Sequence, residues 1–390
     1  MNPLSNLNSY ELNRRLSCEL AGQCSGCPWI EQIYGEQLLS KKSSFLEGLE
    51  ALGLQVAEAE IVPVALGGFR SRLDLTLQTY KGKTRLGLYS SQAREIIDMR
   101  SCPLALPELN DFLAQLREVG LPKVQKGSLR LRVGPEGQKG LWIDFANVDV
   151  RDLLQEDIWL EKISEFCTIE MGQRFKRLIR KPTGEWGLGD LELAPWFQTY
   201  VGPELLPQHL YLPLGGFSQT SWLATQRMIS ALLNRMSLGA GNEVLELFSG
   251  NGNFTLPLLF AGKNVVSVEM SPWAGEAIQR SFAEAQEKLP SGYGTLELFR
   301  KNLYKSDPEL WWKSTWVVDP PRSGLGRLIE NLESGTTKLP SEIFYISCFQ
   351  TSLLQDTQRL MHLGYRPLWI YGVDQFPHTP HCEWIVQFSQ

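Results

Sequence analysis

The C-terminal half of the chain alternates between helical periodicity and short apolar runs. Apolar positions at helical spacing predict a helix over 221–236. The apolar runs that follow predict strands near 243–248, 264–268, 315–318, 343–346 and 368–371. Strands that are apolar on both faces are typical of a parallel sheet covered by helices on each side. The pattern from residue 217 onward therefore predicts a doubly wound α/β sheet.

The N-terminal half has a different pattern. Apolar residues at helical spacing predict a helix over 31–52, after a loop rich in cysteine. Beyond residue 61, runs such as 71–77 and 129–133 alternate between polar and apolar residues between Gly-containing turns, which is typical of antiparallel strands. We predict three parts: a Cys-rich segment with a helix (1–60), a β-rich α+β central domain (61–215) and a Rossmann-like α/β domain (216–390).

Composition indicates an ordinary globular protein. Of the 390 residues, 43% are hydrophobic and 21% are charged, and no run of about 18 apolar residues occurs. The N-terminal sequence lacks the apolar core of a secretory signal. We therefore expect a cytoplasmic monomer with no membrane partner. The net charge of −5 disfavours nonspecific polyanion binding, but a local basic face such as the segment 174–181 can still contact RNA.

Two apolar runs end in reactive side chains. The run at 315–318 stops at an Asp-Pro-Pro-Arg turn that begins with Asp319, and the run at 343–346 stops at a Ser-Cys pair that ends with Cys348. Ligands of open α/β sheets bind beyond the carboxyl ends of the strands, so these side chains are expected to share one rim. Cys348 is then a candidate nucleophile, although a single cysteine is more often a buried, inert thiol.

A glycine-rich turn and an acidic strand end indicate a nucleoside ligand. The strand near 243–248 continues into Ser-Gly-Asn-Gly-Asn (249–253), a turn whose backbone amides can approach a ligand closely. Thr255 stands where a dinucleotide site needs a third glycine, so hydride transfer is disfavoured. The next strand ends at Glu269, where a carboxylate can accept hydrogen bonds from ribose hydroxyls. With Asp319, this pattern favours S-adenosylmethionine over an ordinary β-α-β packing turn.

Five motifs, in order, give the C-terminal part a family resemblance. They are Phe217-Ser218-Gln219, the string LELFSGNGNF at 245–254, Asp319-Pro320-Pro321-Arg322-x-Gly324, Ser347-Cys348 and His378-Thr379-x-His381-x-Glu383. Their order and spacing over roughly the last 175 residues resemble the RNA uracil-5-methyltransferases. The Cys-rich N-terminal part is similar to that of the bacterial 23S ribosomal RNA members, and the chain most resembles the branch without an N-terminal RNA-binding barrel.

The resemblance implies a mechanism and a set of site residues. In these enzymes a thiolate adds to carbon 6 of uracil, carbon 5 attacks the methyl sulfonium, and a base removes the proton of carbon 5. Cys348 is the implied nucleophile and Glu383 the implied base; Cys382 lies at no comparable strand end. The implied contacts of S-adenosylmethionine are Gln219, Phe248, Gly250, Asn253, Glu269 and Asp319. The implied fold is a Rossmann-like methyltransferase domain, and the implied substrate is 23S ribosomal RNA, with transfer RNA as the alternative.

Four of the seven cysteines form a metal-ligand pattern. Cys18-x5-Cys24-x2-Cys27 lies near the N-terminus, and Cys102 lies in the β-rich domain. Soft thiolates select iron–sulfur clusters or zinc, and zinc sites more often have two C-x2-C pairs. The resemblance favours a [4Fe–4S] cluster over zinc. Cys167 has no partner pattern and is expected in the core.

The chain departs from the family pattern near the expected target base. The family's Ser-Cys-Asn-Pro is Ser-Cys-Phe-Gln here, with Phe349 and Gln350 after the cysteine, and Ser221 replaces an expected asparagine. Because the nucleophile, base and cofactor set are kept, we favour an active methyltransferase. The alternatives are a cluster-bearing RNA-binding protein without turnover and a methyltransferase of small molecules or proteins.

Overall fold

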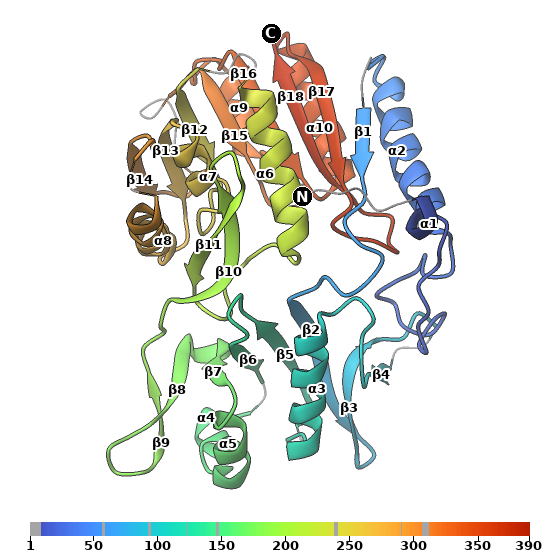
Figure 1. Cartoon of the computed structure of the whole chain (residues 1–390), viewed down its shortest axis with the longest axis vertical. Coiled ribbons are helices and arrows are strands. Elements are labelled where there is room, and N and C mark those ends of the chain that lie inside the picture. Colours follow the sequence, from blue (N-terminus) through green and yellow to red (C-terminus); the bar gives the residue numbers. More distant parts are fainter. Residues whose placement is uncertain are drawn as a thin grey trace.

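The computed structural model describes residues 9–56, 59–92, 95–122, 124–145, 148–237, 241–289, 291–305 and 312–390. Residues 1–8, which belong to the predicted Cys-rich segment, lie outside the described part. No helix of the described residues is both long and apolar enough to cross a membrane. Figure 1 shows the α/β sheet of the C-terminal half in one body and the β-rich sheet in a second body below it.

The predicted doubly wound sheet is present. Within the described residues it has eight strands: β1 (Ala59–Val62), β12 (Glu243–Leu247), β13 (Asn264–Glu269), β14 (Leu296–Arg300), β15 (Thr315–Val318), β16 (Glu342–Ser347), β17 (Arg366–Val373) and β18 (Glu383–Ser389). Their order is β1-β17-β18-β16-β15-β12-β13-β14. The strands from β16 to β14 are parallel, and β18 runs antiparallel between β16 and β17. Parallel strands place their carboxyl ends along one edge, where a ligand can bind.

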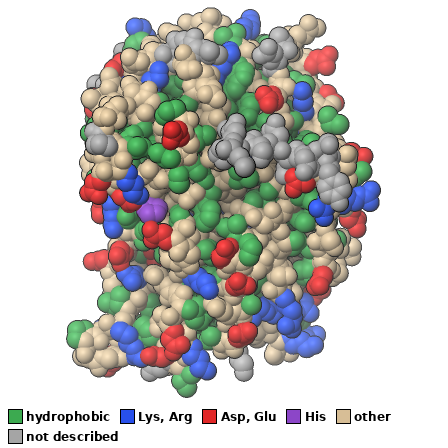
Figure 2. Space-filling model, viewed as in Figure 1, with side chains coloured by type: hydrophobic (Ala, Val, Ile, Leu, Met, Phe, Trp, Pro, Cys, Tyr) green, Lys and Arg blue, Asp and Glu red, His purple; other side chains and the backbone are tan. Residues whose placement is uncertain are grey.

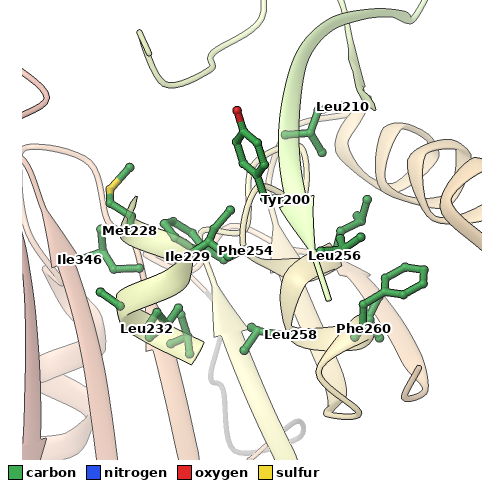
Figure 3. Packing of buried hydrophobic residues seen from close by; sticks show 14 of the residues in the cluster. Tyr200, Leu210, Met228, Ile229, Leu232, Phe254, Leu256, Leu258, Phe260 and Ile346 are labelled. Atoms are coloured by element: carbon green, nitrogen blue, oxygen red, sulfur yellow. The ribbon is translucent and has the colours of Figure 1, made fainter. Parts of the chain in front are cut away.

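Helices cover both faces of this sheet. They are α2 (Tyr34–Ala51), α6 (Trp222–Met236), α7 (Thr255–Phe260), α8 (Ala274–Lys288), α9 (Arg327–Glu333) and α10 (Gln350–His362). Buried residues of α6, α7 and α8 share one hydrophobic cluster, and those of α2, α9 and α10 share another. Figure 3 shows Met228, Ile229 and Leu232 of α6 next to Ile346 of β16. This packing holds the end of β16 against α6.

The central domain is built on a second sheet. Its strands are β2 (Arg72–Tyr80), β3 (Lys83–Tyr89), β4 (Ile96–Asp98), β5 (Lys126–Val133), β6 (Lys139–Asp144), β7 (Thr168–Met171), β8 (Lys176–Arg180) and β9 (Trp186–Gly189). Their order is β4-β3-β2-β5-β6-β7-β8-β9, with one parallel pair, β6 and β7. It is accompanied by α3 (Pro107–Val119), α4 (Val150–Leu153), α5 (Asp157–Ser164) and the 3-10 helix η1 (Gly172–Arg174). The β-rich α+β prediction is confirmed.

A two-stranded hairpin connects the two bodies. It consists of β10 (Ala194–Val201) and β11 (Leu206–Leu212), which pair antiparallel. Phe197 and Leu210 belong to the same buried cluster as Leu256 of α7 and Ile278 of α8. Although we predicted these residues as part of the central domain, their apolar faces pack against the C-terminal sheet.

The N-terminal segment also joins the C-terminal sheet. After the short helix α1 (Ser9–Leu12), α2 packs beside β1, and β1 pairs in parallel with β17. Figure 1 shows both elements along that edge of the sheet. A buried ion pair joins Lys41 Nζ of α2 to Asp374 Oδ1 at 2.5 Å. The boundary predicted at residue 60 falls inside β1, and the three-part division remains a prediction.

Candidate active site

A cavity of about 680 Å³ lies at the carboxyl ends of β12, β13, β15 and β16. Its walls come from the turns that follow these strands, the segment before α6 and the start of β18. All eight residues predicted for catalysis and cofactor binding line it: Gln219, Phe248, Gly250, Asn253, Glu269, Asp319, Cys348 and Glu383. The predicted side chains therefore share one rim.

The turn after β12 brings backbone to the cavity wall. Gly250 and Gly252 have φ angles of +57° and +90°, which favour glycine. A Cβ atom on Gly252 would also come within 3.0 Å of Ile278 Cγ1. Phe248 has φ +63°, a conformation that bulky residues rarely adopt. Backbone strain of this kind is concentrated at functional sites.

The carboxylate of Glu269 is held by backbone amides. Its Oε2 accepts a hydrogen bond from Gly250 N at 3.1 Å, and its Oε1 accepts from Met270 N at 2.7 Å and Ser271 N at 2.9 Å. A carboxylate offers about four acceptor positions. The arrangement fixes Glu269 in one orientation and leaves acceptor capacity for a hydroxyl of a ligand.

Asn253 presents an unsatisfied amide at the cavity. Its backbone carbonyl accepts a hydrogen bond from Thr199 Oγ1 at 2.7 Å. Its side-chain Oδ1 and Nδ2 are both buried and have no hydrogen-bond partner in the described part of the chain. Buried polar atoms almost always have a partner. A polar ligand in the cavity would satisfy both atoms.

Two carboxyl groups at and below the cavity wall have raised pKa values. Burial raises the pKa of Asp319 to about 7, and the negative charge of Glu269 adds to the shift. Below them in β12, burial raises the pKa of Glu246 to about 8, while a hydrogen bond from Thr255 Oγ1 at 2.6 Å opposes the shift. A cationic ligand would be favoured here. The sequence analysis did not single out Glu246, although a charged residue inside an apolar strand could have indicated it.

Cys348 follows β16 directly and lies half-buried in the cavity wall. Burial raises the pKa of its thiol to about 11, and the nearby carboxyls of Glu383 and Asp319 add to the shift. Arg322 lowers the same pKa through its charge and a hydrogen bond. Positive charge added beside the thiol would favour its ionisation.

Glu383 is the first residue of β18 and is 2% exposed. Its Oε2 accepts a hydrogen bond from Gln375 Nε2 at 2.9 Å. Burial raises the pKa of Glu383 well above its ordinary value, Asp319 raises it further, and the bond from Gln375 lowers it. A buried carboxyl facing the same cavity as a thiol is suited to general-base chemistry. Nothing in the sequence pattern indicated Gln375.

The other polar residues of the C-terminal motif lie outside the cavity lining. Cys382 is buried and its Sγ donates to Val373 O at 3.4 Å. His378 is fully buried, with its ring nitrogens 3.1 Å from Gln37 Nε2 and 2.8 Å from Leu66 O. Of the two thiols, the cavity therefore exposes that of Cys348. The ring of His378 connects the C-terminal motif to the N-terminal segment.

The three departures from the family pattern are not among the described residues that line the cavity. Ser221 caps α6, with its Oγ accepting from Ala224 N at 3.2 Å. Gln350 turns toward α2 and donates from Nε2 to Ser44 O at 3.0 Å. The ring of Phe349 lies 6.0 Å from the guanidinium of Arg322. Of the three, Phe349 is the one whose partner, Arg322, lines the cavity.

The four cysteines of the N-terminal pattern are half-buried neighbours. Burial raises the pKa of Cys27 to about 12; Arg70 opposes this shift, while Cys102, Cys24 and Cys18 add to it. Burial likewise raises the pKa values of Cys24 and Cys102, and the guanidinium of Arg70 opposes both shifts. The four thiols thus interact with one another, and Arg70 interacts with three of them.

These thiols do not form a single-ion site. In the described ranges, no three or more His, Cys, Asp or Glu side chains are grouped so that they could hold a metal ion. Cys167 packs against the core of the central sheet, and its Sγ donates to Ile163 O at 3.4 Å.

The basic segment 174–181 is largely matched by acidic residues. Three of its members form ion pairs: Lys176 with Asp190, Arg177 with Glu192, and Arg180 with Glu161. Basic and acidic side chains are likewise interspersed over the face shown in Figure 2. Cationic residues also occur in the cavity lining, namely Arg72, Lys301 and Arg322.

Comparison with known proteins gives close relatives but no matching family model. The chain is 33% identical over 389 residues to an uncharacterized RNA methyltransferase of Bdellovibrio bacteriovorus, with 97% of each chain covered. It is 26% identical over 401 residues to the 23S rRNA (uracil(1939)-C(5))-methyltransferase RlmD of Burkholderia thailandensis, which covers 97% of this chain and 81% of the relative. The RlmD of Pseudomonas aeruginosa is 27% identical over 396 residues.

The fold is similar to a solved structure, the tRNA (uracil-54, C5)-methyltransferase of Pyrococcus abyssi in complex with S-adenosyl-L-homocysteine. The TM-score is 0.64 at 20% identity, over 94% of this chain and 86% of the other. This likeness supports the Rossmann-like methyltransferase fold. Because the Bdellovibrio relative is 33% identical along nearly the whole chain, the protein belongs to the RNA methyltransferase family whose members include the uracil-C5 enzymes RlmD.

Proposed function

We propose that this enzyme transfers a methyl group from S-adenosylmethionine to carbon 5 of a uridine in RNA, through a covalent bond between Cys348 and carbon 6. The observation that carries the proposal is the meeting of Cys348 and Glu383 in one cavity with the predicted cofactor residues. Carbon 5 of uracil is a weak nucleophile and needs covalent activation. Few other methyl acceptors require a thiol and a base together.

The residues act in a fixed order. Cys348, as the thiolate, bonds to carbon 6, and the electrons of the carbon 5–carbon 6 double bond move onto the carbonyl at position 4. Carbon 5 then bonds to the methyl carbon, whose bond to the sulfonium breaks to leave S-adenosylhomocysteine. Glu383 takes the proton from carbon 5, the double bond re-forms, and the bond to Cys348 breaks. Glu383 returns this proton to solvent.

The surrounding charges control the first step. The thiol of Cys348, with a pKa of about 11, is protonated near neutral pH, and the carboxyls of Asp319 and Glu383 oppose its ionisation. S-adenosylmethionine carries a positive sulfonium, which favours ionised thiol and carboxyl groups beside it. Cys348 therefore becomes nucleophilic when the methyl donor is in place.

The cavity walls offer groups suited to the cofactor. Glu269 would accept hydrogen bonds from the ribose, and the unpaired amide of Asn253 would bond polar groups of the ligand. Gly250 and Phe248 would bring backbone close to it, and Asp319 would favour its positive charge. Gln219 lies on the same wall.

We also propose that Cys18, Cys24, Cys27 and Cys102 hold a [4Fe–4S] cluster. The thiol of Cys27 interacts with those of Cys102, Cys24 and Cys18, and soft thiolates favour such a cluster. Arg70 offers a positive charge and a buried Nε with no partner in the described part of the chain. The cluster would fasten the N-terminal loop to the region between β4 and α3.

Ribosomal RNA of the large subunit is the proposed substrate, because relatives named for 23S rRNA match nearly the whole chain. Transfer RNA is the alternative. Mass mapping of 5-methyluridine in ribosomal and transfer RNA, from cells with and without the gene, distinguishes the two substrates.

Trapping with 5-fluorouridine tests the activity itself. Glu383 cannot remove fluorine from carbon 5, so an active enzyme should stop after methyl transfer with the RNA bonded to Cys348. We expect a protein–RNA complex that survives denaturation and requires S-adenosylmethionine. An RNA-binding protein without turnover, or a methyltransferase of small molecules, would give no such complex.

A further inference from the structure

Gln375, between β17 and β18, holds two residues of the cavity with one amide group. Its Nε2 donates to Glu383 Oε2 at 2.9 Å and to Gln219 Oε1 at 2.7 Å. An amide nitrogen carries two hydrogens, so both are used. Gln375 is 0% exposed and is not among the described residues of the cavity lining. It reaches the cavity through these two neighbours.

The backbone around Gln375 is anchored from behind. The adjacent Asp374 pairs with Lys41 Nζ of α2 at 2.5 Å, and both side chains are fully buried. The same ammonium donates to Phe376 O at 3.0 Å. Breaking a buried ion pair is costly because it leaves an uncompensated charge. The chain is therefore anchored on both sides of Gln375.

The direction of the hydrogen bond matters for a base. An ionised carboxylate only accepts hydrogen bonds, so the N–H of Gln375 favours the ionised form of Glu383. Burial and the charge of Asp319 act in the opposite direction and raise the pKa of Glu383. The other titratable groups that interact with it are Cys348 after β16 and Cys382, which also interacts with the Lys41–Asp374 pair.

We infer that Gln375 is a positioning residue for methyl transfer, which holds Glu383 in place and favours its ionised form, so that the proton of carbon 5 can be removed. The inference rests on the proposed role of Glu383 as the base. The second hydrogen bond, to Gln219, fixes the rotation of the amide, because a flipped amide would set its oxygen against two acceptors. Gln375 itself neither gives nor takes a proton.

The test uses Gln375→Met in the full chain, which keeps the side-chain size and removes both donors. Enzyme, S-adenosylmethionine and an unmodified 23S ribosomal RNA transcript are mixed, and decay of the covalent protein–RNA band is followed on denaturing gels across pH. Cys348 is already bonded to carbon 6 in this step, so its own ionisation does not affect the decay rate. The fall of the decay rate at low pH, the acidic limb of the pH profile, therefore reports protonation of the base. We expect that limb to move to higher pH by about one to two units, the effect of one hydrogen bond to a charged group, with the rate recovering at high pH.

A matched control is Gln387→Met. Gln387 lies on β18 and, like Gln375, its amide is bonded to two side chains, Glu342 and Arg235, but neither partner is among the described residues that line the cavity. In Gln387→Met the acidic limb of the pH profile should lie at the same pH as in the wild type. Gln375→Glu replaces the donor with a repelling carboxylate and should move the limb further than Gln375→Met.

Two results overturn the inference: an unmoved limb in both Gln375 variants, or a rate that falls equally at every pH, as a merely structural role would produce. Failure of the proposed function is distinguishable from these. In that case wild-type protein itself forms no covalent band and no 5-methyluridine.

Discussion

Replacement of Glu269 by alanine tests the cofactor site in isolation. Three backbone amides hold this carboxylate, at 2.7 to 3.1 Å, and leave roughly one of its four or so acceptor positions for a ligand. A hydrogen bond to a charged group contributes about 1.5–3 kcal/mol. The change should therefore raise the Kd of S-adenosylmethionine by about 10- to 150-fold, since each 1.4 kcal/mol is a factor of ten.

Isothermal titration calorimetry measures this affinity without RNA. A suitable control is Glu243→Ala, at the opposite end of β12, where the exposed carboxylate pairs with Lys313 Nζ at 2.7 Å. Glu243→Ala should bind S-adenosylmethionine like wild type. If the affinity of Glu269→Ala changed less than about twofold while the variant stayed folded, Glu269 would not contact the ligand and its bonds would serve only the turn.

Three further predictions concern the thiol, the buried ion pair and the cluster. The pKa of Cys348, measured by the pH dependence of its alkylation, should be about 11 in the free enzyme and fall when S-adenosylmethionine binds. S-adenosylhomocysteine, which lacks the positive charge, should have little effect. Equal pKa values with both ligands would refute the idea that the charge of the methyl donor ionises the thiol. Lys41→Met should lower the free energy of unfolding by about 3–5 kcal/mol, because it leaves Asp374 buried and unpaired. Lys313→Met, which removes a surface ion pair, should lower it by about 1 kcal/mol or less. Urea titrations that give similar losses for the two variants would contradict this prediction. Protein purified without oxygen should be brown with about four irons per chain, and a colourless protein with one zinc would overturn the cluster.

The buried parallel strands could be predicted from sequence because their apolar runs are local. Residues 315–318 form β15 and are all buried, and the helix predicted over 221–236 begins after Ser221, which caps it. The glycine turn and the strand-end Glu269 were recognisable for the same reason. Each is set by neighbouring residues in the chain.

The remaining features depend on contacts between distant segments. β18 was not predicted, yet its pairing with β16, in which Ser347 faces Trp384, is what brings Glu383 to Cys348. Gln375 and Gln219 are 156 positions apart, so their hydrogen bond has no local signal. The basic segment 174–181 appeared suited to RNA because its acidic partners, such as Glu161, lie elsewhere in the chain.

The division of labour between Cys348 and Glu383 is tested most directly by Glu383→Gln. This variant can still form the bond to carbon 6 and transfer the methyl group, but it cannot remove the proton of carbon 5. Incubated with S-adenosylmethionine and RNA, it should accumulate methylated RNA bonded to Cys348, visible as a slow band on a denaturing gel. Adding Cys348→Ala to the same variant should abolish the band. Normal turnover without a band would contradict Glu383 as the base, and a band that persists without Cys348 would move the nucleophile elsewhere, with Cys382 as the first candidate.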